Sequence, residues 1–214
     1  MKKSIFVLSA SVLSIVTIAS SQAQQKPETK TTGIESTIIK KDSNQDTIKN
    51  PAQAKTVGGA QMLPTNDIVQ NASQSKNLTT LVTAIQGAGL VDSLKAAGPF
   101  TVFAPTNEAF TKLPEGILDN LKKPDNKEKL AEVVSNHIVA GKFTSRDLAL
   151  AVARSNGNAT LTTVEGDKIL VSINAEKNLQ ITDSKGNIAL VTMFDVEQSN
   201  GIVHVINNVL LPQE

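Results

Sequence analysis

The feature that most constrains the fold is the run of residues 98–110, Gly-Pro-Phe-Thr-Val-Phe-Ala-Pro-Thr-Asn-Glu-Ala-Phe. Residues 100–104 are rich in aromatic and β-branched side chains, which is typical of a strand, and Pro105 ends the pattern because proline cannot donate to a ladder. Thr106 is a good helix N-cap, and Glu108 lies in the first turn, where the helix dipole favours a carboxylate. The sequence therefore predicts a strand that turns directly into a short helix.

A second run, residues 201–212, reads Gly-Ile-Val-His-Val-Ile-Asn-Asn-Val-Leu-Leu-Pro. Isoleucine and valine occupy both sides of the alternation around His204, and a strand that is apolar on both faces is buried on both faces. We therefore expect His204 to lie inside the domain.

The residues before and between these runs divide into a helical part and a strand part. Apolar residues recur at three- and four-residue spacing before residue 100 and predict three short helices, and further helical signals follow at 117–121, 125–134 and 144–148. Asp125 to Glu128 is predicted to form a capping box. Beyond Asn158 the period becomes two, with turn clusters at 165–167, 174–176 and 183–187, which predicts an antiparallel meander. Together these elements indicate an α+β domain.

The two runs resemble the signature motifs of the fasciclin domain, an adhesion and matrix module of secreted and cell-surface proteins. The resemblance extends over about residues 62–212, and neither motif has a second copy. It implies a fasciclin-like fold, an antiparallel β-strand wedge with helices packed around it. It also implies a non-enzymatic module for cell adhesion or for binding the extracellular matrix or cell surface.

Three landmarks of the family fall on identifiable residues. Thr106 and His204 match the family pattern, and Asn107 replaces the common aspartate of the first motif. Between the motifs, where the family carries a tyrosine and a histidine linked to adhesion, this chain has Asn136 and His137. The resemblance makes Asn136, His137 and Ile138 the candidate interaction residues, and Thr106, Asn107 and His204 family-motif residues with structural roles. A helical stripe that includes His137 leaves a second interpretation open, in which it is a core histidine.

The N-terminal residues predict the compartment. Lys2 and Lys3 precede an apolar stretch shorter than the roughly 20 residues that span a bilayer, and small residues stand at the cleavage positions. We expect a signal peptide at 1–23, a disordered polar linker at 24–61, which has no aromatic residue, and the fasciclin-like domain at 62–214. The mature chain is predicted to be secreted or periplasmic, without a membrane span.

Charge and composition exclude several classes of function. Cleavage after residue 23 removes two lysines and leaves a net charge of about −1, so a nucleic-acid partner is not expected. Two histidines without cysteine make a poor zinc set, and no nucleophile elbow or phosphate-binding glycine loop is present, so we expect no metal site, no cofactor and no enzymatic activity.

The expected partner is an extracellular or cell-surface protein. A polysaccharide is a second class, although phenylalanine is the only aromatic residue type available for stacking on sugars. The alternative from a different class is a small-molecule carrier or a cofactor-assisting envelope protein, which would need a sizeable apolar cavity with a few polar groups. A purely structural matrix component is a third possibility.

Overall fold

The computed structural model describes residues 54–95 and 98–213. The expected signal peptide and most of the expected linker lie outside the described residues. The first part of the domain forms a hairpin and the three predicted helices: β1 (Lys55–Val57), β2 (Ala60–Met62), α1 (Ile68–Gln74), α2 (Thr79–Ala88) and α3 (Val91–Lys95).

The middle of the chain contains the predicted strand and helix of the first motif. Its elements are β3 (Phe100–Pro105), α4 (Asn107–Thr111), α5 (Ile117–Leu121), the 3-10 turn η2 (Pro124–Asn126), α6 (Lys127–Ser135), β4 (Ile138–Ala140) and α7 (Ser145–Arg154). The direct turn from strand to helix is confirmed. The capping box predicted at 125–128 does not form, since Asn126 is the N-cap of α6 and its side chain makes no capping bond. Helix α7 continues to Arg154, well beyond the single turn expected to end at residue 148.

The predicted meander is also confirmed. It consists of β5 (Asn158–Thr162), β6 (Lys168–Ile173), β7 (Leu179–Thr182) and β8 (Ile188–Gln198), and the buried strand β9 (Gly201–Ile206) follows. The seven strands are ordered β4-β3-β9-β8-β7-β6-β5. All neighbours are antiparallel except β3 and β9, which pair in parallel with Phe103 opposite His204. A single bridge between Val139 and Thr163 links the two ends of this order, so the sheet nearly closes on itself.

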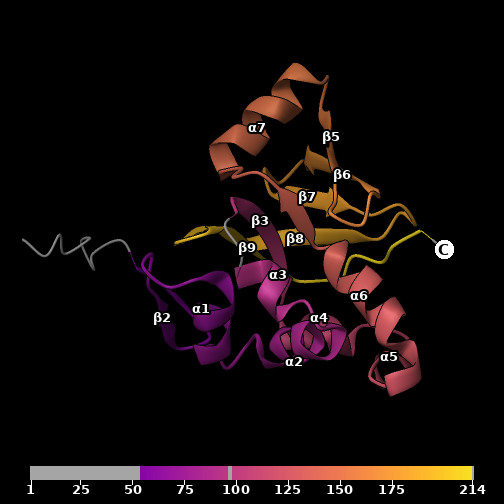
Figure 1. Ribbon diagram of the computed structural model, residues 1–214. Helices are drawn as coiled ribbons and strands as arrows, with labels where there is room; N and C mark the ends of the chain where they lie inside the picture. Colours follow the sequence, from indigo (N-terminus) through magenta and orange to yellow (C-terminus); the bar gives the residue numbers. More distant parts are fainter. Residues whose placement is uncertain (1–53, 96–97, 214) are drawn as a thin grey trace, which may run out of the picture. The chain divides into compact units, whose positions relative to one another are not determined.

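Two hydrophobic cores lie on opposite faces of the central strands. The helix-side core joins α1, α2, α3, α4 and α6 to one face, where Val102 and Ala104 point. The α7-side core joins α7 to the meander and to Phe103 from the same central strand. Figure 1 shows α7 on one side of the strands and the other helices on the opposite side. Alternate residues of β3 thus enter different cores, which is why every residue from Thr101 to Pro105 is buried.

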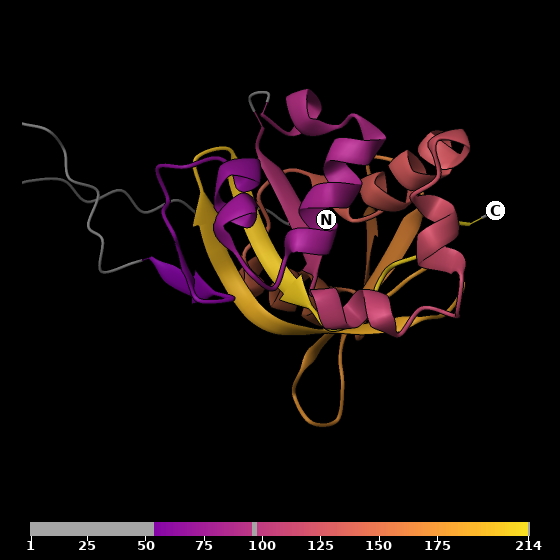
Figure 2. The same ribbon diagram turned by 90° about the horizontal axis from the view of Figure 1, so that it is seen from below.

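The β1–β2 hairpin corrects the expected domain boundary. It occupies the last part of the stretch assigned to the linker, yet Val57 and Met62 are buried members of the helix-side core. Figure 2 shows this hairpin beside β8. The folded domain therefore begins by Lys55 rather than at residue 62, because two apolar side chains in a polar segment are enough to fix a short hairpin on an existing core.

Across residues 54–95 and 98–213, no helix has the length and apolar character needed to cross a membrane. The same residues contain no group of three or more histidine, aspartate or glutamate side chains placed to hold a metal ion.

Candidate interaction site

The first motif is held together by its own polar side chains. The Thr106 hydroxyl accepts a hydrogen bond from the backbone N–H of Ala109 at 3.3 Å and caps α4. Asn107 joins α4 to the start of α2, since its Oδ1 accepts from the N–H of Thr80 at 3.0 Å and its Nδ2 donates to the carbonyl of Lys76 at 2.8 Å. A carboxylate could not make the second of these bonds because it has no hydrogen to donate. The asparagine of this chain therefore has a structural use.

His204 is completely buried, as predicted, on the face of β9 that meets the α7-side core. Its ring stacks on Phe103 with 5.8 Å between ring centroids. Nε2 lies 2.9 Å from the carbonyl oxygen of Phe143, and Nδ1 accepts the N–H of Asp195 at 3.3 Å. These partners fix a neutral ring with its proton on Nε2. Burial lowers the pKa of His204, and the Phe143 hydrogen bond opposes that shift only in part.

The residues around His204 have the composition of a catalytic triad without its geometry. Ser145 donates its hydroxyl to the Asp195 carboxylate at 2.5 Å, and the same carboxylate accepts the N–H of Ser145 at 2.7 Å. His204 meets only the backbone of Asp195 and gives its other nitrogen to Phe143. No base therefore faces the Ser145 hydroxyl, and Asp195 instead binds the first residue of α7.

The candidate interaction residues Asn136, His137 and Ile138 lie inside the domain, with exposed fractions of 0%, 2% and 5%. They sit at the end of α6 and the start of β4, between the two cores. None presents a side chain to a partner, so the expectation of a docking surface at this landmark is corrected. The cause is the topology. Strand β4 pairs with β3 inside the sheet, so the residues directly before β4 are buried as well.

His137 connects α6 to the C-terminal segment. Its Nδ1 lies 2.7 Å from the carbonyl oxygen of Val133, and its Nε2 accepts the N–H of Leu210 at 2.9 Å. The ring must therefore be neutral with its proton on Nδ1. Desolvation by burial lowers the pKa of His137 to about 4, against smaller opposing contributions from the Val133 bond and from Asp183. His137 is therefore a core histidine, as in the second interpretation of its helical stripe.

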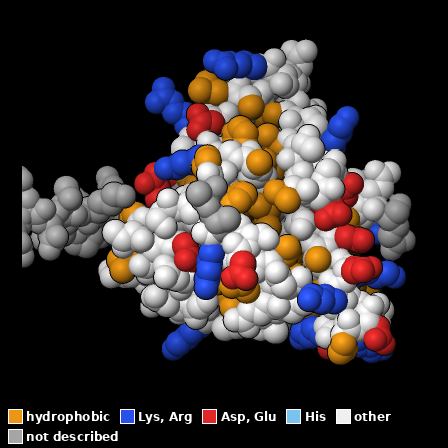
Figure 3. All heavy atoms as spheres, viewed as in Figure 1, with side chains coloured by type: hydrophobic (Ala, Val, Ile, Leu, Met, Phe, Trp, Pro, Cys, Tyr) orange, Lys and Arg blue, Asp and Glu red, His pale blue; other side chains and the backbone are white. Residues whose placement is uncertain are grey.

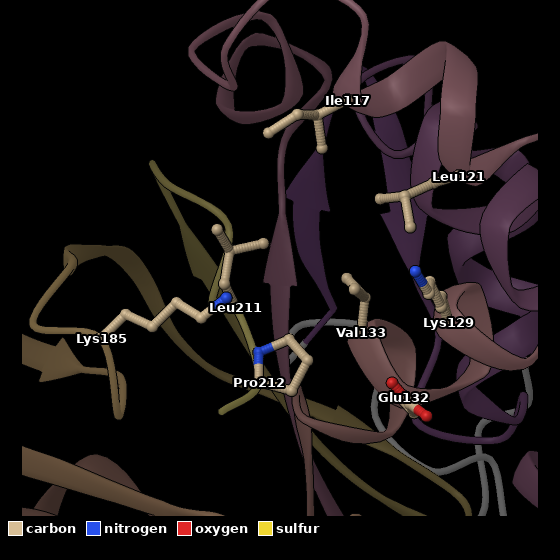
Figure 4. A pocket seen from close by; sticks show the side chains of 8 residues that line it. All are labelled: Ile117, Leu121, Lys129, Glu132, Val133, Lys185, Leu211 and Pro212. Atoms are coloured by element: carbon tan, nitrogen blue, oxygen red, sulfur yellow. The ribbon is translucent and has the colours of Figure 1, made fainter. Parts of the chain in front are cut away.

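A pocket of about 180 Å³ lies between α5, α6, the β7–β8 turn and the C-terminal segment (Figure 4). Its walls are Ile117, Leu121, Val133, Leu211 and Pro212, with Lys129, Glu132 and Lys185 among them. This is the kind of feature that a small-molecule carrier would need. Its volume is below the roughly 300 Å³ at which pockets for drug-sized ligands begin.

Large apolar side chains are exposed in one part of the domain. Among the described residues they are Leu150, Val164, Leu170, Ile173 and Ile188, with exposed fractions between 41% and 53%, and we call them the exposed apolar set. All five fall between residues 150 and 188, in α7 and the meander, and none in the helical part. The sequence does not single them out, because period two predicts which residues share a face and not which face remains uncovered.

Two members of this set share one face of the sheet. Leu170 pairs with Thr182, and Thr182 pairs with Ile188, so both apolar residues stand in one cross-strand row. Adjacent strands are about 4.8 Å apart, which places the two side chains on the same patch, roughly 10 Å from each other.

Comparison with known proteins decides the family. The model of the fasciclin domain matches residues 76–212, which contain both motifs, His137 and His204. The chain belongs to the fasciclin family.

Its relatives include bacterial proteins. Protein sll1483 of Synechocystis sp. is 40% identical over 68% of this chain and 73% of its own length. The cell surface glycolipoprotein MPB83 of Mycobacterium bovis is 31% identical over 82% of this chain and 72% of its own length. A solved structure of a domain pair from the insect cell adhesion molecule fasciclin I matches with a TM-score of 0.61 at 21% identity, over 68% of this chain and 51% of that one. The fasciclin fold predicted from the two motifs is therefore confirmed.

Proposed function

We propose that this chain is an exported, non-enzymatic fasciclin module that binds a protein of the cell surface or extracellular matrix through α7 and the meander. The observation that carries the proposal is the pair Leu170 and Ile188 of the exposed apolar set, which stand in one cross-strand row on the face of the meander that points away from the α7-side core. Neighbouring exposed apolar side chains favour protein association, whereas single scattered ones need no explanation.

The face drawn in Figure 3 carries a further apolar area. Apolar side chains gather there in a strip that runs from α7 towards the helices below it, with acidic side chains along one edge. An apolar centre with a charged border is the usual composition of a protein interface.

A polysaccharide partner has less support. Sugar binding usually relies on exposed aromatic rings, and the aromatic residues of the described chain are Phe100, Phe103, Phe110, Phe143 and Phe194. Two of them are buried and the other three are partly buried. No aromatic ring in the described part of the chain thus forms an open platform on which a sugar could stack.

The proposal that the chain is exported rests on its N-terminal sequence and on a relative in the family. MPB83 is named as a cell surface protein, and residues 1–23 have the composition of a signal peptide. Intact-mass analysis of the protein from its native host should show a chain that begins at Gln24. A membrane-bound protein that retains Met1 would contradict this part of the proposal.

The binding surface is tested with labelled mature protein on intact host cells, before and after mild protease treatment of their surface. The double variant Leu170→Ser/Ile188→Ser should bind at least tenfold more weakly than wild type. The matched control Lys122→Ser/Lys123→Ser, on exposed residues of the helical part, should bind normally. Protease treatment should abolish wild-type binding. Binding that survives protease, or that is equal in the two double variants, would overturn the proposal.

A further inference from the structure

The three hairpin loops of the meander have the same backbone design. In each, the first residue donates its N–H to the carbonyl of the fifth, and the fourth donates to the carbonyl of the first, as in Thr163 to Asp167, Asn174 to Asn178, and Asp183 to Asn187. The fourth residue has a left-handed backbone in every loop. Glycine occupies that position twice, as Gly166 with φ 104° and Gly186 with φ 86°, but the middle loop has Lys177 with φ 64°.

A lysine at this position costs conformational energy that glycine avoids. Left-handed backbone brings a β-carbon close to the following carbonyl oxygen, and glycine has no β-carbon. The other two loops show that this chain uses glycine for the same turn. The middle loop thus keeps a side chain where the backbone disfavours one, and an outlier of this kind points to a use for that side chain.

Lys177 borders a pocket of about 260 Å³ between the start of α7, the β6–β7 loop and the middle of β8. The other lining residues are Ser145, Ala149, Ile173, Leu179 and Phe194. Four of these five are apolar. The hydroxyl of Ser145 is already donated to Asp195, so the charge on the rim belongs to Lys177.

The carboxylates near this pocket are bound to other groups. Asp195 accepts from Ser145, Asp147 accepts the N–H of Thr144 in the capping box of α7, and Glu176 accepts from Asn178. The side chain of Lys177 has no hydrogen-bond or ion-pair partner among the residues that the structure describes, and its backbone N–H binds the carbonyl of Asn174. The pocket therefore combines an apolar floor with an unpaired cation.

A second left-handed residue fixes the wall opposite Lys177. Asp195 has φ 54° and lies where the pairing of β8 with β9 shifts register, directly after Phe194. Its carboxylate takes both the N–H and the hydroxyl of Ser145, so the bulge of β8 is tied to the start of α7. Phe194 is held against His204 by an edge contact with 6.5 Å between ring centroids. These contacts preorganise the pocket walls in the absence of a ligand.

We propose that this pocket receives a large apolar side chain from an acidic segment of the partner protein, while Lys177 pairs with a carboxylate beside that side chain. The proposal rests on the proposed function, since it assumes a protein partner, and it adds the chemistry of the partner. Charge complementarity carries the choice of occupant, because the apolar floor accommodates an anchor and the unpaired cation favours an acidic flank. Ile173 in the pocket wall is 43% exposed, so an incoming apolar side chain can reach it from solvent.

The test uses a blocked pentapeptide with a central phenylalanine flanked by two glutamates on each side. It is titrated into the full mature chain at low salt and followed by amide NMR shifts. Two comparison peptides have alanine at the centre or lysines on the flanks. The acidic phenylalanine peptide should shift amides around Ala149, Ile173 and Lys177, and each comparison peptide should bind at least tenfold more weakly.

The decisive variant is Lys177→Gly, with Lys185→Gly in the neighbouring loop as the control of equal charge. Lys177→Gly should bind the acidic peptide at least tenfold more weakly and melt no lower than wild type, whereas Lys177→Arg and Lys185→Gly should retain binding. Peptide binding unchanged by Lys177→Gly, absent in wild type, or mapped elsewhere would overturn the inference. Cell binding of wild type would still stand in those cases, so failure of the pocket and failure of the proposed function are separable.

Discussion

The segment at residues 136–138 and strands β6 and β8 of the meander differ in whether their side chains reach solvent. Asn136, His137 and Ile138 are buried, and His137 links α6 to the C-terminal segment. Leu170 and Ile188 are apolar and stand largely uncovered in one row of the sheet. The family landmark between the two motifs thus maintains the fold, and the proposed binding surface lies in residues with no motif. Disturbing the landmark should cost stability, and disturbing the strands should cost binding.

The largest expected effect comes from His204→Asp. The new carboxylate would lie in the α7-side core and would face the carbonyl oxygen of Phe143, where His204 now donates a hydrogen bond. We expect a loss of about 3–5 kcal/mol of unfolding free energy at neutral pH, because an uncompensated charge is buried. Chemical denaturation measures this loss. The gap between variant and wild type should narrow at pH 4, where the aspartate can be protonated, and an unchanged denaturation midpoint would contradict the burial of His204.

Next in size is the double variant Asn136→Ala/His137→Ala. It removes buried side-chain volume and both hydrogen bonds of His137, and we expect it to lower the free energy of unfolding by about 2–4 kcal/mol. Leu210 would lose the acceptor for its N–H. Hydrogen exchange at Leu210 should therefore accelerate more than exchange in the meander. Equal acceleration in both regions would show that His137 does not hold the C-terminal segment.

Acid should lower the free energy of unfolding through the same residue, His137. The pKa of His137 is lowered from 6.5 to about 4, so between these values the unfolded chain binds more protons than the folded chain. The free energy of unfolding therefore falls as pH decreases through this window, by at most about 3 kcal/mol from His137. His204 acts in the same direction because its pKa is also lowered.

Urea denaturation at several pH values between 7 and 4 tests this dependence. His137→Gln should reduce the slope of the unfolding free energy against pH, because glutamine does not titrate. Leu170→Ser/Ile188→Ser serves as the control from the meander and should keep the wild-type slope. A variant at His137 with the full slope would assign the acid sensitivity to other groups.

Local patterns predict most of the fold and little of the site. The strand and helix of residues 100–111, the buried strand β9 and the meander follow from periodicity and capping, which act over a few residues. The parallel pairing of β3 with β9 joins segments about one hundred residues apart, and no local signal records it. The β1–β2 hairpin escapes prediction because its strands are short and mostly polar.

The candidate site could not be predicted for a related reason. Burial of Asn136 depends on β4 joining β3, a tertiary event that overrides the exposure expected of asparagine. Exposure of Leu170 depends on no helix covering that face of the sheet. The role of Lys177 becomes visible only when the three loops are compared, because its left-handed backbone cannot be read from its neighbours in sequence.

The central claim is that residues 136–138 stabilise the fold and that Leu170 and Ile188 bind the partner. It is most directly tested by measuring cell binding and unfolding together for the two double variants. Leu170→Ser/Ile188→Ser should keep its unfolding free energy within about 0.5 kcal/mol of wild type, as exposed substitutions usually do, and lose at least tenfold in binding. Asn136→Ala/His137→Ala should unfold far more easily and bind normally per folded molecule. The opposite pattern, with binding lost at the landmark and retained on the strands, would contradict the account.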